Sequence, residues 1–516
     1  MRYRMLWVLL FCFSTAVSAE GRRYDLQFEK KAILYGEQRS GNMGNAVAAG
    51  DFDGDGIDDL AVATPGADRS DPDRKIAGRI DVYFGGPERR ADEAHTGTGE
   101  ADWVIFGGGE KDGIGYSLVA GDLDGDGRDE LVVGSIFLDG PDGERVNCGG
   151  AYVFYGGPRH EGRRVIDLAR EPADIAIFGA EAKDHLTGDM AAGDLDGDGR
   201  DDLVLGAFYA DGPENGRHHC GEAHVLFGAP RSALPPVIDL AETTLPWIYG
   251  AEASDTFGRA LAIGDLDGDG KGDIIGGAYY ADGPDNERIN AGEVYVLYGR
   301  PRDRFPSETD LTDGADLHIY GEAEGFVTGR DVAAADMNRD GRDDMLIGAH
   351  FGTVDPRDTE GSRDGVLYIV YGRPERGMVG VLDLGTNADC RIHGGESHEQ
   401  LGWPLITGVI DEEGNEAVIA VAKKSSGGEL ARHEAGEAYF ISSRPLRETL
   451  RGRISIDEAA DFSVVGSNER DKAAFSGAVL DWNGDGRPEI ALGVPDAGGP
   501  SGDAPSAGET ILFFVP

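Results

Sequence analysis

Residues 51–59 read DFDGDGIDD, which places acidic side chains at positions 1, 3, 5 and 9 of a short loop. Alternate side chains of such a loop converge on one point, and the glycines at positions 4 and 6 allow the positive φ angles that a tight loop needs. Similar loops begin at residues 51, 122, 194, 265, 336, 411 and 481, with spacings of 71, 72, 71, 71, 75 and 70 residues. This regularity predicts seven tandem copies of one structural unit.

Each copy contains four short runs of strand-forming residues. In the second copy they include Leu131–Gly134 after the loop, then Gly150–Tyr155 and Ile175–Phe178. Runs rich in Val, Ile, Tyr and Phe, separated by Gly, Pro and Asp, are typical of antiparallel strands and tight turns. A unit of this size buries little apolar area alone, so the copies should stack on one another. The sequence therefore predicts an all-β fold, a seven-bladed β-propeller of four-stranded antiparallel blades.

The phase of the repeat predicts how the ring closes. The C-terminal run Glu509–Val515 matches the third strand of a unit, whereas Ala32–Gly36 near the N-terminus matches the fourth. We therefore expect the N-terminal strand to complete the last blade. Residues 20–516 are expected to form one propeller domain.

The first 19 residues have the features of a signal peptide. Arg2 and Arg4 precede an apolar stretch, and small side chains follow at Val17 and Ala19. We therefore expect a secreted protein, extracellular or periplasmic, and a monomer. No later apolar run approaches the length of about 20 residues that a membrane span requires. The formal charge of −47 disfavours nucleic acid as a partner.

Six of the loops have the oxygen ligands that a hard cation such as Ca²⁺ prefers. Solvated Asp-Gly turns are the simpler alternative, but six aligned copies disfavour it. Position 7 would contribute its backbone carbonyl. The loop at 411–419 is degenerate, because Ile419 stands at position 9, and no metal is expected there. The predicted ligands of up to six Ca²⁺ are Asp51, Asp53, Asp55, Ile57 and Asp59; Asp122, Asp124, Asp126, Arg128 and Glu130; Asp194, Asp196, Asp198, Arg200 and Asp202; Asp265, Asp267, Asp269, Lys271 and Asp273; Asp336, Asn338, Asp340, Arg342 and Asp344; and Asp481, Asn483, Asp485, Arg487 and Glu489.

Two segments resemble the FG-GAP repeat of the integrin α-subunit propeller and its bacterial relatives. One runs from Gly115-Tyr116 through Asp122 to Val133-Gly134, and the other from Phe257-Gly258 through Asp265 to Gly277-Ala278. The resemblance implies a seven-bladed propeller with Ca²⁺ in the hairpins between first and second strands, on the face opposite the ligand-binding loops. Integrins carry calcium in only a few blades, and this repeat array has no inserted von Willebrand-type domain. Integrin-type adhesion is therefore not implied.

The loops after the second strands are the candidate ligand face. Tyr209, Tyr279, Tyr280, His350 and Phe351 stand at the ends of second strands. Loops on a rigid scaffold commonly carry recognition, so these aromatic residues either bind a ligand or only pack the tops of the blades.

The sequence contains no nucleophile elbow, phosphate loop or His-Glu-x-x-His motif, so no catalytic residue is predicted. His218-His219-Cys220 could ligate a transition metal, although a plain surface loop is the commoner outcome. A binding or adhesion scaffold with a protein or carbohydrate ligand on the loop face fits best. Two alternatives stay open: a propeller hydrolase or lyase with an axial active site of convergent His, Lys or Arg, and a self-assembling surface protein.

Overall fold

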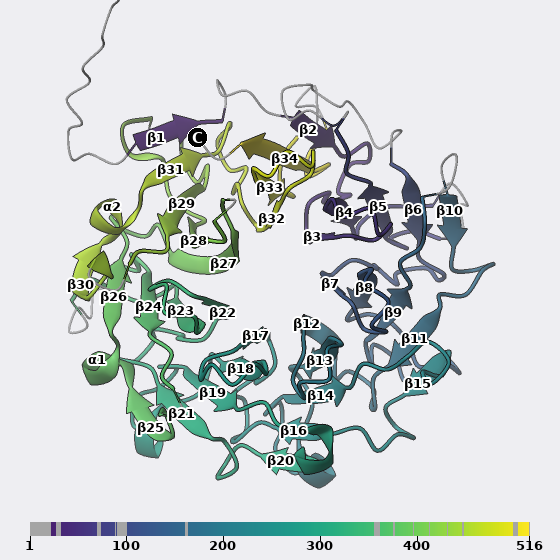
Figure 1. Cartoon of the computed structure of the whole chain (residues 1–516), viewed down its shortest axis with the longest axis horizontal. Helices are drawn as coiled ribbons and strands as arrows, with labels where there is room; N and C mark the ends of the chain where they lie inside the picture. The colour runs from purple at the N-terminus through teal and green to yellow at the C-terminus, as the bar shows by residue number, and fades with distance from the viewer. Residues whose placement is uncertain are drawn as a thin grey trace, which may run out of the picture.

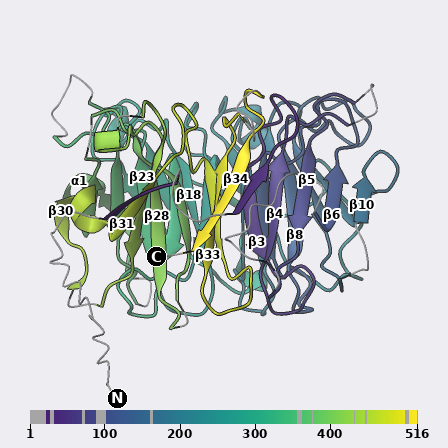
Figure 2. The same cartoon turned by 90° about the horizontal axis from the view of Figure 1, so that it is seen from above.

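Seven β-sheets surround a central axis in the computed structural model of the chain (Figure 1). The structure describes residues 22–26, 32–69, 74–87, 89, 101–159, 164–355, 362–374, 377–395, 397–411, 413–430, 432–445, 448–498 and 504–514. The predicted signal peptide, residues 1–19, lies outside these residues. Seen from the side, strands of neighbouring sheets run next to one another across the thickness of the ring (Figure 2). The prediction of a seven-bladed all-β propeller is confirmed.

Each blade is an antiparallel sheet whose first strand lies beside the axis and contacts the first strands of its neighbours. From the axis outward, the four strands are β3 (Val47–Gly50), β4 (Asp59–Thr64), β5 (Arg79–Tyr83) and β6 (Trp103–Phe106) in blade 1; β7 (Ser117–Gly121), β8 (Glu130–Ser135), β9 (Gly150–Phe154) and β11 (Ile175–Phe178) in blade 2; β12 (Leu186–Gly193), β13 (Asp202–Ala207), β14 (Glu222–Leu226) and β16 (Trp247–Tyr249) in blade 3; β17 (Ala260–Gly264), β18 (Asp273–Ala278), β19 (Glu293–Leu297) and β21 (Leu317–Tyr320) in blade 4; β22 (Asp331–Ala335), β23 (Asp344–Ala349), β24 (Val366–Val370) and β26 (Cys390–His393) in blade 5; β27 (Leu401–Val409), β28 (Glu416–Ala422), β29 (Glu437–Ser442) and β31 (Phe462–Val465) in blade 6; and β32 (Ser476–Leu480), β33 (Glu489–Val494), β34 (Glu509–Phe514) and β2 (Ala32–Tyr35) in blade 7.

The core lies between neighbouring blades. Ile80 and Val82 of β5, for example, pack in one apolar cluster with Leu131 and Val133 of β8. A unit of about 70 residues needs this contact, because the interface with the next blade supplies most of its buried apolar surface.

Six blades carry a fifth strand, so the expectation of four-stranded antiparallel blades was incomplete. In each case a segment outside the blade pairs in parallel with its fourth strand. The outermost strand would otherwise leave an unpaired edge, and the fifth strand covers it. The fifth strands are β10 (Arg164–Asp167) on β6, β15 (Val237–Asp239) on β11, β20 (Glu308–Asp310) on β16, β25 (Gly380–Asp383) on β21, β30 (Gly452–Ser455) on β26 and β1 (Arg22–Asp25) on β31.

The N-terminal segment contributes strands to the last two blades. β1 pairs with β31 in blade 6, and β2 pairs antiparallel with β34 in blade 7, with Ala32 opposite Leu512 and Tyr35 opposite Glu509. Segments from both ends of the chain therefore share one sheet.

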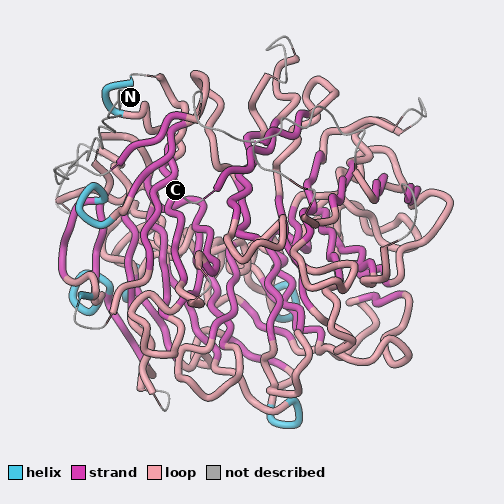
Figure 3. The backbone as a smooth tube through the Cα atoms, turned by 45° about the horizontal axis from the view of Figure 1, so that its top comes forward, coloured by secondary structure: helices cyan, strands magenta, loops and turns pink. Residues whose placement is uncertain are grey.

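In the part of the chain that the structure describes, helices are few and short (Figure 3). They are the α-helices α1 (Leu384–Asn387) and α2 (Ile456–Ala459) and the 3₁₀ turns η2 (Pro213–Asn215), η3 (Pro284–Asn286), η4 (Arg302–Arg304) and η5 (Gly428–Leu430). Among the described residues, every helix is too short to cross a bilayer.

An arginine before the third strand clamps the fifth strand in five blades. Its guanidinium forms an ion pair with the aspartate that ends the fifth strand and donates a hydrogen bond to the glycine carbonyl after the fourth strand. Sequence reasoning missed this clamp, although each of the five aspartates is followed by leucine. The pairs are Arg74–Asp167, Arg145–Asp239, Arg217–Asp310, Arg288–Asp383 and Arg432–Asp25, with carbonyls of Gly107, Gly179, Gly250, Gly321 and Gly466.

The Asp167→Asn substitution should lower the free energy of unfolding at pH 7 by about 3 kcal/mol, because it breaks a buried ion pair. Hydrogen bonds from Arg74 lower the pKa of Asp167 to about 2. The ionised pair therefore stabilises the fold above the ordinary pKa, and this contribution is lost as pH falls from about 4 to 2. Urea unfolding of the parent protein and of Asp167→Asn should show that the difference between their free energies of unfolding becomes smaller below about pH 4.

Asp310→Asn is the matched control for this prediction. Its pair with Arg217 has side chains 36% and 27% exposed, against 9% for both side chains of Arg74 and Asp167. Solvent screening should reduce its cost to about 1 kcal/mol. If Asp167→Asn and Asp310→Asn lowered the free energy of unfolding equally, the prediction that the more buried ion pair contributes more would be wrong.

Candidate functional site

The acidic loops connect the first and second strands of the blades. In the loop at 51–59, Asp51 accepts hydrogen bonds from the backbone N–H of Gly54 at 2.7 Å and Gly56 at 2.9 Å. Both glycines have positive φ, 78° and 83°. The position-1 carboxylate makes the same bond to position 6 in all six predicted metal loops. The loops are therefore closed by their own first side chain.

The position-9 carboxylates are buried at the start of the second strands. Asp59 accepts hydrogen bonds from the N–H groups of Phe52 at 2.9 Å and Gly85 at 2.7 Å. Burial raises the pKa of Asp59 to about 8. An ionised carboxylate in such a place is costly unless a cation compensates for the lost hydration. The six are Asp59, Glu130, Asp202, Asp273, Asp344 and Glu489, each at most 1% exposed.

Three carboxylates converge in each of four loops, with their ligand oxygens within 4.8 Å of one another. In the first three loops the group consists of positions 1, 3 and 9, and in the fourth it consists of positions 1, 3 and 5. These clusters could hold a metal ion. The groups are Asp51, Asp53 and Asp59; Asp122, Asp124 and Glu130; Asp194, Asp196 and Asp202; and Asp265, Asp267 and Asp269.

The two remaining loops have asparagine at position 3. Asn338 donates from Nδ2 to Asp344 Oδ1 at 3.0 Å, and Asn483 donates from Nδ2 to Glu489 Oε1 at 2.7 Å. The Oδ1 atoms of both asparagines are buried and accept no hydrogen bond from any described residue. Buried oxygens without a donor are suited to a cation, so these residues fit Ca²⁺.

The structure corrects the phase of the degenerate loop. Gly408 pairs with Ala417 as Gly50 pairs with Asp59, so the loop equivalent to 51–59 is 409–417 and not 411–419. Val409 and Ala417 therefore occupy positions 1 and 9, and neither side chain offers an oxygen. With this phase the spacings of 75 and 70 residues become 73 and 72. Matching by sequence aligned Asp411 with the position-1 aspartates of the other loops. The pairing of the two flanking strands instead fixes the register.

Acids at position 8 join neighbouring blades, a role that sequence reasoning missed. Each accepts a hydrogen bond from the backbone N–H of position 1 in the preceding loop. The acceptors are Asp129 for Asp51, Asp201 for Asp122, Asp343 for Asp265, Glu416 for Asp336 and Asp58 for Asp481, at 2.7 to 3.0 Å. The last of these bonds links blades 7 and 1, so it crosses the closure of the ring.

Arginines that follow third strands lie over acidic loops of the preceding blade. Arg159 approaches Asp53 at 3.9 Å. Arg231 forms an ion pair with Asp124 and lies 2.8 Å from Asp126 Oδ2. A cation in the loop at 122–130 therefore competes with Arg231.

At the opposite end of the first strands, the blades enclose an axial pocket of about 260 Å³. Each blade contributes the residue that follows a backbone position with positive φ, just before or within its first strand. The seven residues are Asn45, Tyr116, Gly188, Arg259, Arg330, Trp403 and Phe475. Sequence reasoning named none of them as functional. The signal was their shared place in the repeat, which in five of the seven blades is directly after a glycine.

The predicted ligand-face aromatics divide into two groups. Tyr279 and His350 lie against the pocket wall, since the Arg330 guanidinium carbon is 5.1 Å from the Tyr279 ring centroid and His350 is 5.5 Å from Trp403. Tyr209 and Tyr280 are 38% and 46% exposed. Phe351 lies tilted against His350, with 4.1 Å between the ring centroids and 45° between the ring planes.

A scan against protein-family models matches the FG-GAP repeat at residues 43–83, 114–143, 257–297 and 328–370. The chain contains FG-GAP repeats. These matches include the loops at 51–59, 122–130, 265–273 and 336–344. The loops at 194–202 and 481–489 lie outside the matches but have the same hydrogen bond from the position-6 N–H to the position-1 carboxylate. The predicted resemblance to the FG-GAP propeller of integrin α-subunits is confirmed.

The chain spans less than a quarter of the length of the first curated relatives that it matches. Integrin alpha-PS2 of Drosophila melanogaster is 30% identical over 280 residues, which cover 53% of this chain and 17% of the integrin. Phosphatidylinositol-glycan-specific phospholipase D of Rattus norvegicus is 31% identical over 218 residues, which cover 42% of this chain and 24% of the phospholipase. The match to the solved structure of an exotype rhamnogalacturonan lyase covers 94% of this chain and 76% of the lyase chain, at 14% identity and a TM-score of 0.36.

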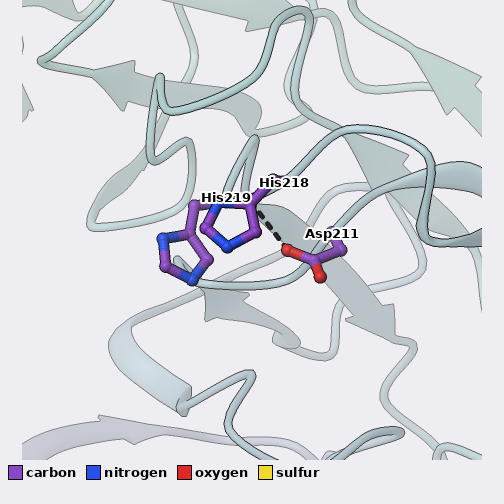
Figure 4. A group of neighbouring side chains, drawn as sticks. All are labelled: Asp211, His218 and His219. Carbon is purple, nitrogen blue, oxygen red and sulfur yellow. Dashed lines mark hydrogen bonds between the residues drawn. The ribbon is translucent and has the colours of Figure 1, made fainter.

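The histidine pair that precedes the third strand of blade 3 forms a small polar cluster with Asp211 (Figure 4). Cys220, which the sequence placed with the pair, is instead buried, and burial raises the pKa of its thiol to about 12. Asp211 accepts a hydrogen bond from the backbone N–H of His219 at 2.8 Å. Asp139 and Asp282 make the same bond in neighbouring blades, so this contact belongs to the repeat and needs no metal.

Proposed function

We propose that this FG-GAP propeller is a secreted, monomeric, calcium-binding scaffold that binds a protein or carbohydrate ligand on the face of the axial pocket. The observation that supports calcium is the set of six buried position-9 carboxylates, from Asp59 to Glu489. Calcium would neutralise these groups and so stabilise each blade. The ligand would use the opposite face, where the loops after second strands gather.

The proposed ligands in each loop are the side chains at positions 1, 3, 5 and 9 and the carbonyl of position 7. For the first loop these are Asp51, Asp53, Asp55, Ile57 and Asp59. A calcium ion there takes several carboxylate oxygens and one carbonyl, a donor set that a hard cation prefers. Asn338 and Asn483 retain an oxygen but remove a charge, so their loops should bind more weakly.

A metal count tests this proposal directly. After dialysis against buffered calcium, mass spectrometry of the digested protein should find five to six calcium ions per chain. Five would be expected if Arg231 keeps its place in the loop at 122–130. Fewer than two ions per chain would show that the acidic loops are only turns.

An enzyme is the second candidate, because Arg259, Arg330, Lys423 and His350 gather near the axis. Calcium bound in the acidic loops would not act as the electrophile of such an enzyme. A first strand of five residues separates each loop from the axial pocket by roughly 15 Å. Turnover of a polysaccharide or peptide that is lost in Lys423→Met but kept in Asp273→Asn would establish an axial active site.

A further inference from the structure

Two histidines and an aspartate meet in the loop between the second and third strands of blade 3. The ring centroids of His218 and His219 lie 3.7 Å apart, and the Asp211 carboxylate points toward the two rings (Figure 4). Each of the three side chains offers one ligand atom, a ring nitrogen or a carboxylate oxygen, and these atoms all lie within 4.8 Å of one another. Three such atoms are close enough to contact one cation.

The backbone of the repeat brings the two neighbouring imidazoles to the same side of the chain. The second residue after the clamp arginine has a positive φ in all five clamped blades, between 52° and 55°, and in blade 3 this residue is His219 with 54°. Successive side chains of an extended chain point in opposite directions. A left-handed residue turns the chain instead, so the rings of His218 and His219 face each other.

Hydrogen bonds to the backbone hold this loop in place without a metal. The carbonyl oxygens of His218 and His219 accept from the N–H groups of Ser254 at 2.9 Å and Thr256 at 3.1 Å. Asp211 uses Oδ1 to accept from the N–H of His219, and its Oδ2 accepts no hydrogen bond from a described residue. The three side chains are therefore positioned before a cation arrives, which lowers the cost of binding one.

The charges around the pair favour a cation. Burial and the charges of Glu181 and Asp211 raise the pKa of Asp184 to about 7, which shows that acids gather here. Burial and the neighbouring His218 lower the pKa of His219. Neutral imidazole is the form that binds a metal, and nearby carboxylates raise the local concentration of cations.

Among the five clamped blades, only blade 3 has two histidines at this point of the repeat. Asp139 and Asp282 make the contact of Asp211 in blades 2 and 4, but no histidine accompanies them. The repeat therefore accounts for the aspartate and leaves the histidine pair without a structural reason. The two residues after the clamp arginine are Lys75-Ile76, Val146-Asn147, His218-His219, Ile289-Asn290 and His433-Glu434.

We propose that His218, His219 and Asp211 bind a late first-row divalent cation such as Zn²⁺, at the opposite end of the second strands from the acidic loops. Imidazole nitrogens suit zinc, copper and nickel, whereas Ca²⁺ prefers a shell of oxygen ligands. Three protein ligands leave a coordination position for water or for a donor group of a bound molecule. Asp211 takes the place of Cys220, which the sequence grouped with the histidines. The site does not depend on calcium in the acidic loops.

Titration calorimetry with Zn²⁺ on the untagged full chain, in saturating Ca²⁺, tests the proposal. We expect one zinc ion per chain with a dissociation constant of about 1 μM or below. His218→Ile combined with His219→Asn gives the pair that blade 4 has at the same place, so this double variant should fold like the parent and lose the zinc ion.

Two single variants complete the test. Asp211→Asn keeps an oxygen for the N–H of His219 but loses the charge, and it should weaken zinc binding about ten-fold. His433→Asn removes a lone histidine from the equivalent place in blade 6 and should leave zinc binding unchanged. The calcium count should be the same in all variants.

Melting curves with and without zinc give a second readout. Without zinc the double variant should melt at the temperature of the parent. Zinc at about 100 times its dissociation constant should raise the melting temperature of the parent by roughly 3 °C and leave that of the double variant unchanged. The inference is wrong if the parent binds no zinc, if the double variant binds as many zinc ions as the parent, or if Asp211→Asn binds zinc as tightly as the parent.

Discussion

Chelation of calcium is expected to lower the melting temperature of the protein by roughly 15 °C. A site filled at about 100 times its dissociation constant stabilises the folded state by about 2.7 kcal/mol, and six such sites act on one closed ring. For a chain of 516 residues the unfolding entropy near the melting point is about 1 kcal/mol per degree. Dividing the summed stabilisation of the six sites by this entropy gives the expected fall in melting temperature. The physical cause is repulsion and lost hydration among carboxylates such as Asp59 and Asp53 when no cation is present.

Scanning calorimetry with calcium, with a chelator, and with the chelator plus excess magnesium measures this effect. Magnesium serves as the control because it demands octahedral geometry and retains its water, so it should restore little of the lost stability. An unchanged melting temperature in chelator would mean that the hydrogen bonds of the loops suffice without metal.

Asp273→Asn should remove one calcium ion per chain and lower the free energy of unfolding in calcium by about 3 kcal/mol. Asp273 is the buried position-9 residue of blade 4, where it accepts hydrogen bonds from Leu266 N at 2.9 Å and Gly299 N at 2.8 Å. In chelator the difference between variant and parent should shrink to about 1 kcal/mol or less. Burial raises the pKa of Asp273 to about 8, so without calcium the parent bears a cost that the neutral side chain avoids.

Asp411→Asn is the matched control, because Asp411 lies in the loop at 409–417, which lacks oxygen side chains at positions 1 and 9. We expect its calcium count and its stability in calcium to equal those of the parent. If Asp411→Asn also loses an ion, or if Asp273→Asn keeps all of them, the assignment of ligands by position is wrong.

The sequence by itself determined the seven blades and the six acidic loops, because both depend on short-range patterns. A loop that closes on Asp51 through Gly54 and Gly56 needs only neighbouring residues, and the near-constant spacing reveals its copies. The same reliance on local pattern caused the error in the degenerate loop, where Asp411 was matched to position 1. Pairing of Gly408 with Ala417 across a hairpin decides that register instead.

Only the tertiary structure decided the contacts between distant segments. The clamp of Arg74 on Asp167 joins residues 93 apart, and the fifth strands pair with blades to which they are not adjacent in the chain. The axial pocket brings together residues of all seven blades, from Asn45 to Gly477, and Lys423 lies against one of them, Trp403. No local pattern encodes such neighbours, because they meet only when apolar faces stack and the ring closes.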